Sequence, residues 1–163
     1  MKLSHRIQTF LLLALAVLTA LPVAAQEKLS EVEYQKQLGL AFMKKIAERD
    51  DVLTMESGLQ LQTVKFGTGS RPRPKDSVVV NFKGFTVDGK KFSEGEGIEF
   101  PLLQLIEGFR EGLLLMSEGG RAIIVIPCEL GYGDEGAAPD IPGGATLLFD
   151  VELVKVLPAA VKK

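Results

Sequence analysis

The sequence predicts an α+β protein, in which an antiparallel β-sheet with one short helix is preceded by a separate amphipathic helix. Three observations support this class. Apolar residues recur every four positions from Tyr34 to Ile46, which is the spacing of one helical face. After Ser57 the apolar residues instead alternate with polar ones, as in half-buried strands. The dipeptide Asp88-Gly89 between two such segments is typical of a two-residue hairpin turn.

The first 25 residues have the pattern of a secretory signal. Lys2 and Arg6 form a basic start, and nine apolar residues follow from Phe10 to Leu18. This apolar segment is much shorter than the roughly 20 residues that span a bilayer. We therefore expect cleavage after Ala25, export to the periplasm, and no stable membrane insertion afterwards. An uncleaved membrane anchor is the alternative.

The composition of the remaining chain excludes several kinds of chemistry. It carries 17 basic and 21 acidic residues, a net charge of −4, which disfavours nucleic-acid partners. The only histidine is His5, inside the signal, and the only cysteine is Cys128. Histidine triads, Cys/His zinc sites, dithiol chemistry and an intrachain disulfide are therefore excluded. We expect no metal and no cofactor, and we interpret Cys128 as a small packing residue.

Residues 30–49 are predicted to form one amphipathic helix. Ser30 and Glu33 have the spacing of a capping box, and basic residues collect near the other end. The apolar stripe of this helix is expected to pack on its own domain or on a second copy of the chain. Residues 26–56 are thus interpreted as an N-terminal helix and a linker, the linker running from Asp50 to Glu56.

The strands are predicted from alternation and turn residues. They comprise a segment with Leu59, Leu61 and Thr63, then 77–85, 91–92, 98–100, 121–126 and 146–157. A loop containing Gly95 and Gly97 is expected between the third and fourth of these. A long loop carrying Pro139 and Pro142 is expected from Cys128 to Gly144.

One short helix is predicted between the strands, where apolar residues are spaced three or four apart at Ile106, Phe109, Leu113 and Met116. The acidic pairs Asp50-Asp51 and Asp134-Glu135 are interpreted as solvated loop charges.

Several segments, in this order and at this spacing, resemble the FKBP-type peptidyl-prolyl isomerases, especially the exported bacterial, Mip-like branch. They are Val80-Asn81-Phe82-Lys83-Gly84, Asp88-Gly89-Lys90-Lys91-Phe92, Ile106-Glu107-Gly108-Phe109, Gly119-Gly120-Arg121, Gly131-Tyr132-Gly133 and the run from Ala145 to Leu153. The resemblance covers about 100 residues. It implies a five- to six-stranded antiparallel sheet wrapped around one short helix, with the isomerase domain at residues 57–158 and a tail at 159–163.

The resemblance also implies a site between sheet and helix that binds proline-containing polypeptides and isomerises the X–Pro bond. It assigns catalytic roles to Tyr132, Phe109 and Phe149. It assigns substrate binding to Phe82, Phe92, Ser93, Ile98, Leu105, Ile106 and Ile141. In this assignment Phe109 forms the floor, while the backbone amide of Ile106 and the hydroxyl of Tyr132 bind substrate carbonyls.

Three positions depart from the family pattern. Phe82 stands where close relatives commonly carry tyrosine, Ser93 where they carry aspartate, and Phe109 where they carry tryptophan. The aspartate and its hydrogen-bond donors are thus lost together. This joint loss is expected, because a buried carboxylate without donors is costly. We expect isomerase activity at a reduced level, and weaker binding of rapamycin-type macrolides, which use the aspartate.

Two other functions stay open at this point. One is an FKBP-like chaperone or peptide-binding module with little catalysis, suggested by these departures. The other is a scaffold that forms a homodimer through residues 30–49.

Overall fold

The computed structural model describes residues 30–159. Helix α3 spans Glu31–Ala47 and begins where the Ser30 hydroxyl accepts a hydrogen bond from the Glu33 amide at 3.2 Å. The helix predicted for residues 30–49 is therefore confirmed. The predicted signal, residues 1–25, and residues 160–163 of the predicted tail lie outside the described residues. Within the described part of the chain, no helix is both long and apolar enough to cross a membrane.

A six-stranded antiparallel sheet forms the body of the fold, in the order β1-β2-β5-β6-β3-β4. Its strands are β1 (Leu53–Thr54), β2 (Gln60–Lys65), β3 (Ser77–Thr86), β4 (Lys91–Pro101), β5 (Arg121–Ile126) and β6 (Leu147–Leu157). The second helix, α4, spans Glu107–Leu114, and single 3₁₀ turns occupy Leu102–Gln104 (η1) and Cys128–Leu130 (η2). The predicted α+β class, with a sheet wrapped around one short helix, is confirmed.

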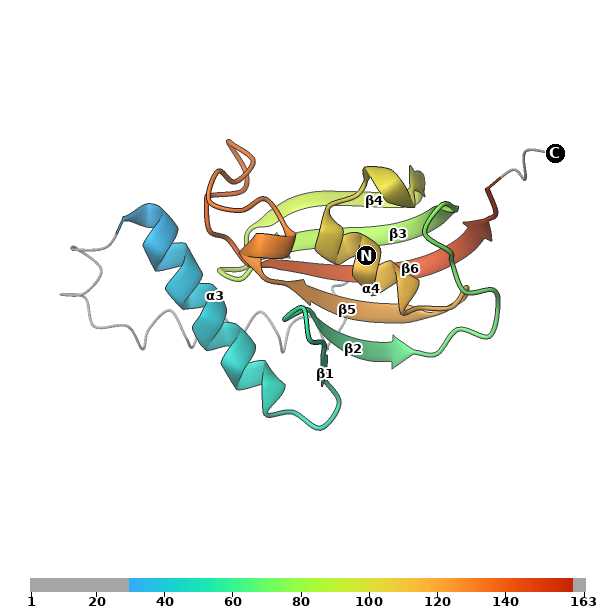
Figure 1. Ribbon diagram of the computed structural model, residues 1–163, viewed down its shortest axis with the longest axis horizontal. Helices are drawn as coiled ribbons and strands as arrows, with labels where there is room; N and C mark the ends of the chain where they lie inside the picture. The colour runs from blue at the N-terminus through green and yellow to red at the C-terminus, as the bar shows by residue number, and fades with distance from the viewer. Residues whose placement is uncertain (1–29, 160–163) are drawn as a thin grey trace.

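The two faces of the sheet pack against different helices (Figure 1). On the α4 face, Ile124 of β5 and Val151 of β6 join Leu113 of α4 in one core. On the other face, Ile123 of β5 contacts a second core to which α3 contributes Phe42. Consecutive residues of a strand point to opposite faces, so β5 is apolar from Ala122 to Ile126 because both of its faces are covered there.

In the segment of strand β2, the alternation of apolar and polar residues predicted the buried leucines correctly but not the burial of the residues between them. Leu59 and Leu61 are buried as predicted, but the intervening Gln60 and Gln62 are also buried, at 3% and 1% exposed. The Gln60 side-chain amide donates to the backbone carbonyl of Met43 in α3 at 3.0 Å. The polar face of β2 is therefore not solvated, because α3 lies beside it.

The segment expected to be a linker, residues 50–56, contains strand β1. Its two residues pair with β2, Leu53 opposite Leu61 and Thr54 opposite Gln60. Asp51 is also fixed, since it forms an ion pair with Arg49 and accepts a hydrogen bond from Gln62. The expected linker therefore contains a strand, which the sequence did not reveal because two residues are too few for a periodic pattern. Asp50 and Asp51 are exposed, as the prediction of solvated loop charges requires.

The glycine-containing loop predicted inside the return strand is absent, and β4 runs unbroken from Lys91 to Pro101. The pairing register with β3 shifts between Val80 and Phe82, whose partners are Ile98 and Gly95. This shift is a β-bulge, and Gly97 within it has φ +64°. The glycines therefore mark a bulge in a continuous strand.

Candidate functional site

Five phenylalanine rings from four elements meet on the α4 face of the sheet. They are Phe82 of β3, Phe92 and Phe100 of β4, Phe109 of α4 and Phe149 of β6. We refer to these five residues as the ring cluster. Residues up to 67 positions apart in the sequence thus form one aromatic surface, as the resemblance implied for four of them.

The centre of the ring cluster is the stacked pair Phe109 and Phe149, with ring centroids 4.4 Å apart. Phe82 lies 6.2 Å from each of them, and Phe92 meets Phe149 edge-on at 5.5 Å. The stacked pair is buried at 3% and 5% exposed, whereas Phe82, Phe92 and Phe100 are half-buried. The cluster thus has a dry interior and an aromatic rim, and such ring pairs contribute about 0.5–1.5 kcal/mol beyond area burial.

Two glycines leave the space that the rings occupy. A Cβ atom on Gly84 of β3 would lie 2.6 Å from the Phe92 ring and 3.1 Å from that of Phe149. A Cβ atom on Gly95 of β4 would lie 2.6 Å from Ile98 and 3.1 Å from the Phe82 ring. A larger residue at Gly84 would displace the Phe92 ring, and one at Gly95 would displace Ile98 and press on the Phe82 ring.

Ser93 lies beside the ring cluster because of a second register shift between β3 and β4. Ser93 is the cross-strand partner of Gly84, while Phe85 pairs with Lys91, so Phe92 is the extra residue of the bulge. Cross-strand partners share a face of the sheet, and the Gly84 face is the one occupied by the Phe149 ring. The half-buried Ser93 thus presents a hydroxyl to the neighbourhood of the rings.

Four of the remaining predicted site residues lie against this core or beside its rings, and Tyr132 lies in the loop that follows η2. Leu105 and Ile106 precede α4, are partly buried, and pack against the same core as Phe149. Ile141 belongs to that core and is 6% exposed. Ile98 on β4 and Tyr132 after η2 are more open, at 39% and 40% exposed.

Two hydrogen-bond donors of the predicted site residues have no acceptor among residues 30–159. Ile106 is the N-cap of α4, and its backbone amide donates to no described residue. The Tyr132 hydroxyl likewise has no partner within residues 30–159, although the Tyr132 carbonyl accepts from the Gly136 amide at 3.1 Å. Both donors are therefore free to bind a ligand carbonyl.

The site is electrically neutral. The predicted site residues are apolar apart from the hydroxyls of Ser93 and Tyr132. Nearby Cys128 is buried, and burial, together with its hydrogen bond to Glu129, raises the pKa of its thiol to about 11. Its interpretation as a packing residue is confirmed, because a protonated buried thiol is a poor nucleophile. Among the described residues, no group of three or more His, Cys, Asp or Glu side chains is arranged to hold a metal ion.

Phe100 is the member of the ring cluster that the sequence did not assign to the site. Its ring lies 5.7 Å from that of Phe82. The predicted strand 98–100 already places Ile98 and Phe100 on one face, because side chains alternate along a strand. That alternation could have added Phe100 to the site, since Ile98 was assigned to it.

The sequence profile of the FKBP-type peptidyl-prolyl cis-trans isomerase family matches residues 68–154. The FKBP-type isomerase FkpA of Escherichia coli K12 is 44% identical over 125 residues, which is 74% of this chain and 46% of FkpA. The probable FKBP-type isomerase FkpA of Neisseria meningitidis is 40% identical over 137 residues, 82% of this chain and 50% of that protein. The chain thus spans about half the length of these relatives.

Solved structures agree with the sequence comparison. The crystal structure of FkpA from Escherichia coli superposes with a TM-score of 0.77 at 39% identity, covering 98% of this chain and 76% of that one. A peptidyl-prolyl cis-trans isomerase from Pseudomonas syringae gives a TM-score of 0.75 at 28% identity, covering 80% of this chain and 99% of that one. The family match, the shared fold and the ring cluster agree, and the chain therefore belongs to the FKBP-type peptidyl-prolyl cis-trans isomerase family.

Proposed function

We propose that this protein is a peptidyl-prolyl cis-trans isomerase that acts on X–Pro bonds and assists the folding of exported polypeptides. The observation that carries this proposal is the neutral ring cluster, and the two unused donors of Ile106 and Tyr132 support it. The names of the relatives, which are FKBP-type peptidyl-prolyl cis-trans isomerases, support the same reaction.

The reaction needs no acid, base or nucleophile, because no covalent bond is made or broken. Rotation about a peptide bond faces a barrier of about 18–20 kcal/mol, since resonance holds the amide planar. The uncatalysed X–Pro bond therefore isomerises in about 10–100 s. A site accelerates this rotation if it binds the twisted amide more tightly than the planar one.

The magnitudes assign most of the acceleration to the apolar surroundings. A millionfold acceleration requires about 8 kcal/mol. A neutral hydrogen bond from Tyr132 contributes about 1 kcal/mol net. Water favours the planar, charge-separated amide, and the aromatic surface of Phe82, Phe92, Phe109 and Phe149 replaces that water. Shape and dryness are thus the main effects, with Tyr132 as an aid.

The roles follow from position. Phe109 supplies the buried floor on which a proline ring rests, the stacked Phe149 forms a wall beside it, and Tyr132 donates to a substrate carbonyl. The substrate is further bound by Phe82, Phe92, Ser93, Ile98, Leu105, Ile106 and Ile141, with the Ile106 amide as second donor.

Export to the periplasm is part of the proposal. It is supported by the basic and apolar start of the sequence and by relatives from Escherichia coli and Neisseria meningitidis. The clients are then proline-containing polypeptides that fold after export.

Weak binding of rapamycin-type macrolides is a second part of the proposal. Ser93 is neutral where the family pattern has an aspartate, and Phe82 carries no hydroxyl to support one. The loss of a charge-assisted hydrogen bond costs about 1.5–3 kcal/mol of affinity.

A homodimer through residues 30–49 stays a prediction, with a constraint from the structure. Leu38, Phe42 and Ile46 are fully buried against the chain's own sheet. Two copies can pair through this stripe only if α3 of one copy packs on the sheet of the other. Size-exclusion chromatography with light scattering, across a range of protein concentrations, measures this directly.

A proline-peptide isomerisation assay tests the main proposal. The purified protein is expected to accelerate cis-to-trans conversion, and Phe149→Ala to lose at least tenfold in kcat/KM. Phe66→Ala is the matched control, because Phe66 is 83% exposed and outside the ring cluster. No acceleration by the folded wild-type protein at high concentration would contradict the proposal and favour a peptide-binding module without catalysis.

A further inference from the structure

The loop between η2 and β6 carries two of the proposed site residues, Tyr132 and Ile141. We refer to residues 131–146 as the 131–146 loop. It is tied together internally: the Gly144 amide donates to the Gly133 carbonyl at 2.8 Å, and Ala137 and Ile141 exchange hydrogen bonds of 2.8 and 2.9 Å. Displacement of its outer end therefore moves Tyr132 and Ile141 together.

Helix α3 contacts this loop directly. The ammonium of Lys36 lies 2.6 Å from a carboxylate oxygen of Asp134, two residues from Tyr132. This hydrogen bond raises the pKa of Lys36. Figure 1 shows the loop beside the N-terminal half of α3. Asp134, which the sequence predicted to be a solvated loop charge, is therefore paired with Lys36.

Close backbone packing adds to this ion pair. A Cβ atom on Gly144 would lie 2.5 Å from the Val32 carbonyl oxygen, and one on Gly39 would lie 2.1 Å from the Thr146 hydroxyl. Val32, Lys36 and Gly39 are spaced four and three residues apart, so they form one stripe along α3. This stripe is distinct from the apolar stripe of Leu38, Phe42 and Ile46 that covers the sheet.

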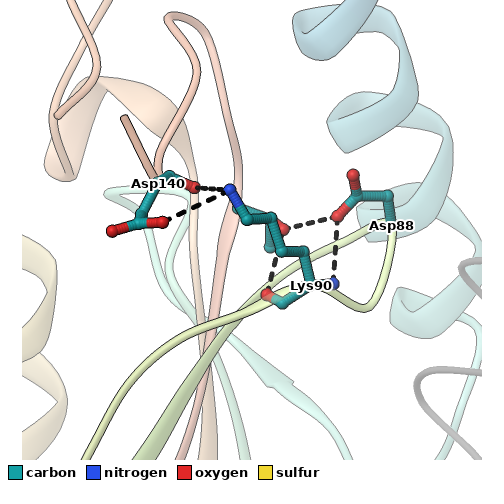
Figure 2. A network of polar contacts seen from close by, with 4 residues as sticks. Asp88, Lys90 and Asp140 are labelled. Atoms are coloured by element: carbon teal, nitrogen blue, oxygen red, sulfur yellow. Dashed lines mark hydrogen bonds and ion pairs between the residues drawn. The ribbon is translucent and has the colours of Figure 1, made fainter. Parts of the chain in front are cut away.

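A second cation holds the same loop from the β3–β4 hairpin, as Figure 2 shows. The ammonium of Lys90 lies 3.4 Å from the Asp140 carboxylate and donates to the Asp140 carbonyl at 3.3 Å. The backbone of Lys90 is itself fixed, since its amide donates to Asp88 at 3.2 Å. Asp140 directly precedes Ile141, so this contact lies next to a proposed site residue.

We propose that Lys36 of α3 and Lys90 of the hairpin are positioning residues that hold the 131–146 loop, and with it Tyr132 and Ile141, over the ring cluster. Helix α3 thus contributes to the site without touching substrate. This inference rests on the proposed isomerase function for its kinetic part, whereas its structural part is measurable without any activity.

Both ion pairs are partly exposed, with side-chain exposures of 36% and 64% for Lys36 and Asp134, and 51% and 58% for Lys90 and Asp140. Exposed pairs contribute little to global stability. Their loss is therefore expected to loosen the loop while leaving the melting temperature nearly unchanged. That combination separates positioning from a general structural role.

Charge reversal tests the contact with α3. Lys36→Glu is expected to lower kcat/KM for a proline peptide about threefold, because it replaces attraction to Asp134 by repulsion. The double variant K36E/D134K restores the pair in the opposite sense and is expected to recover most of the loss. Lys44→Glu is the matched control, since it makes the same charge change at an exposed α3 position remote from the loop.

Charge reversal at the hairpin is the second arm. Lys90→Glu is expected to lower kcat/KM by a similar factor, with recovery in K90E/D140K. The losses in the K36E and K90E variants should shrink at high salt, where exposed charges are screened.

A spectroscopic readout keeps the inference separate from the activity. The chain has two tyrosines and no tryptophan, so in a Tyr34→Phe background Tyr132 is the only tyrosine fluorophore. Its fluorescence anisotropy is expected to fall in K36E and K90E, to recover in the charge-swapped pairs, and to stay unchanged in K44E.

Unchanged anisotropy in both reversals, or equal losses without recovery in the swapped pairs, would overturn the inference. An inactive wild-type protein whose Tyr132 anisotropy still responds as described would contradict the proposed function and leave the loop contacts established.

Discussion

At the level of single residues, the site combines a buried aromatic floor with donors that are free. Tyr132 is the clearest example, because the residue is 40% exposed and its hydroxyl has no partner among residues 30–159. A substitution there removes a possible contact with substrate and no hydrogen bond that the described protein makes with itself.

Tyr132→Phe is expected to lower kcat/KM about fivefold, the equivalent of the roughly 1 kcal/mol of one neutral hydrogen bond. The melting temperature should stay within one degree or so of the wild type, because no internal bond is lost. Peptide kinetics and thermal unfolding check the two parts. A loss of a hundredfold or more would show that the hydroxyl, rather than the apolar surface, dominates catalysis.

Ser93 and Phe82 form the second residue-level prediction. Ser93→Asp alone places a carboxylate beside the rings without a donor, and we expect it to destabilise the protein by about 1–3 kcal/mol. Phe82→Tyr together with Ser93→Asp supplies a hydroxyl that donates to the carboxylate. The double variant should bind a rapamycin-type macrolide at least tenfold more tightly than the wild type, as measured by calorimetry.

The matched comparison is Phe82→Tyr alone, which adds the hydroxyl without the charge. Equal macrolide affinity in the wild type and the double variant would refute the account of the lost polar network.

At the level of elements, helix α3 is the feature with two contact faces. One face closes the back of the sheet through Phe42 and Ile46, and the other meets the 131–146 loop at Lys36 and Gly39. A glycine inside a helix costs about 1 kcal/mol relative to alanine. Gly39 is therefore explained by close packing rather than by helix formation.

Gly39→Ala is expected to destabilise the protein by about 1–3 kcal/mol, because the added methyl group would lie 2.1 Å from the Thr146 hydroxyl. Helix propensity alone predicts the opposite sign. Chemical denaturation measures the difference. Ala41→Gly is the informative counterpart, since it changes helix propensity in the same helix without creating that clash. A more stable Gly39→Ala variant would show that α3 does not pack here as described.

At the level of the whole molecule, the carboxylate of Asp76 binds the chain segment that follows the last strand, β6. Asp76 accepts hydrogen bonds from the Ala159 amide at 2.9 Å and the Arg73 amide at 2.8 Å. These two hydrogen bonds hold the pKa of Asp76 below its ordinary value, and the bond from Ala159 has the larger effect. Because the folded pKa is lower than the unfolded one, the ionised group stabilises the fold above the unfolded pKa, and this contribution is lost as pH falls through the folded pKa.

Asp76→Asn is therefore expected to melt at a lower temperature than the wild type at pH 7, with the gap closing below about pH 4. Thermal unfolding across this pH range provides the measurement. Asp50→Asn, at an exposed position, should follow the wild type throughout. A gap that stays constant down to acidic pH would mean that ionisation of Asp76 does not contribute.

Most elements could be predicted from local sequence because their patterns are local. Helix α3 follows from its four-residue spacing and its Ser30 cap, and strand β5 at Arg121–Ile126 matches the predicted bounds. The hairpin at Asp88-Gly89 is confirmed, with Gly89 at φ +89°, but its loop has three residues, 87–89, because the Thr86 amide donates to the Lys90 carbonyl. The two misassigned regions, β1 and the bulge in β4, depend on pairing with a distant strand, which leaves no periodic signal.

The sequence by itself determined the class of fold and the exclusion of histidine and dithiol chemistry. Family resemblance supplied the ten proposed site residues, four of which meet in the ring cluster. Only the tertiary structure decided that Phe100 joins the ring cluster, that Gln60 and Gln62 are buried, and that α3 holds the loop bearing Tyr132. The physical reason is that each of these depends on contacts between segments far apart in the chain, whereas turns, caps and apolar periodicity act over a few residues.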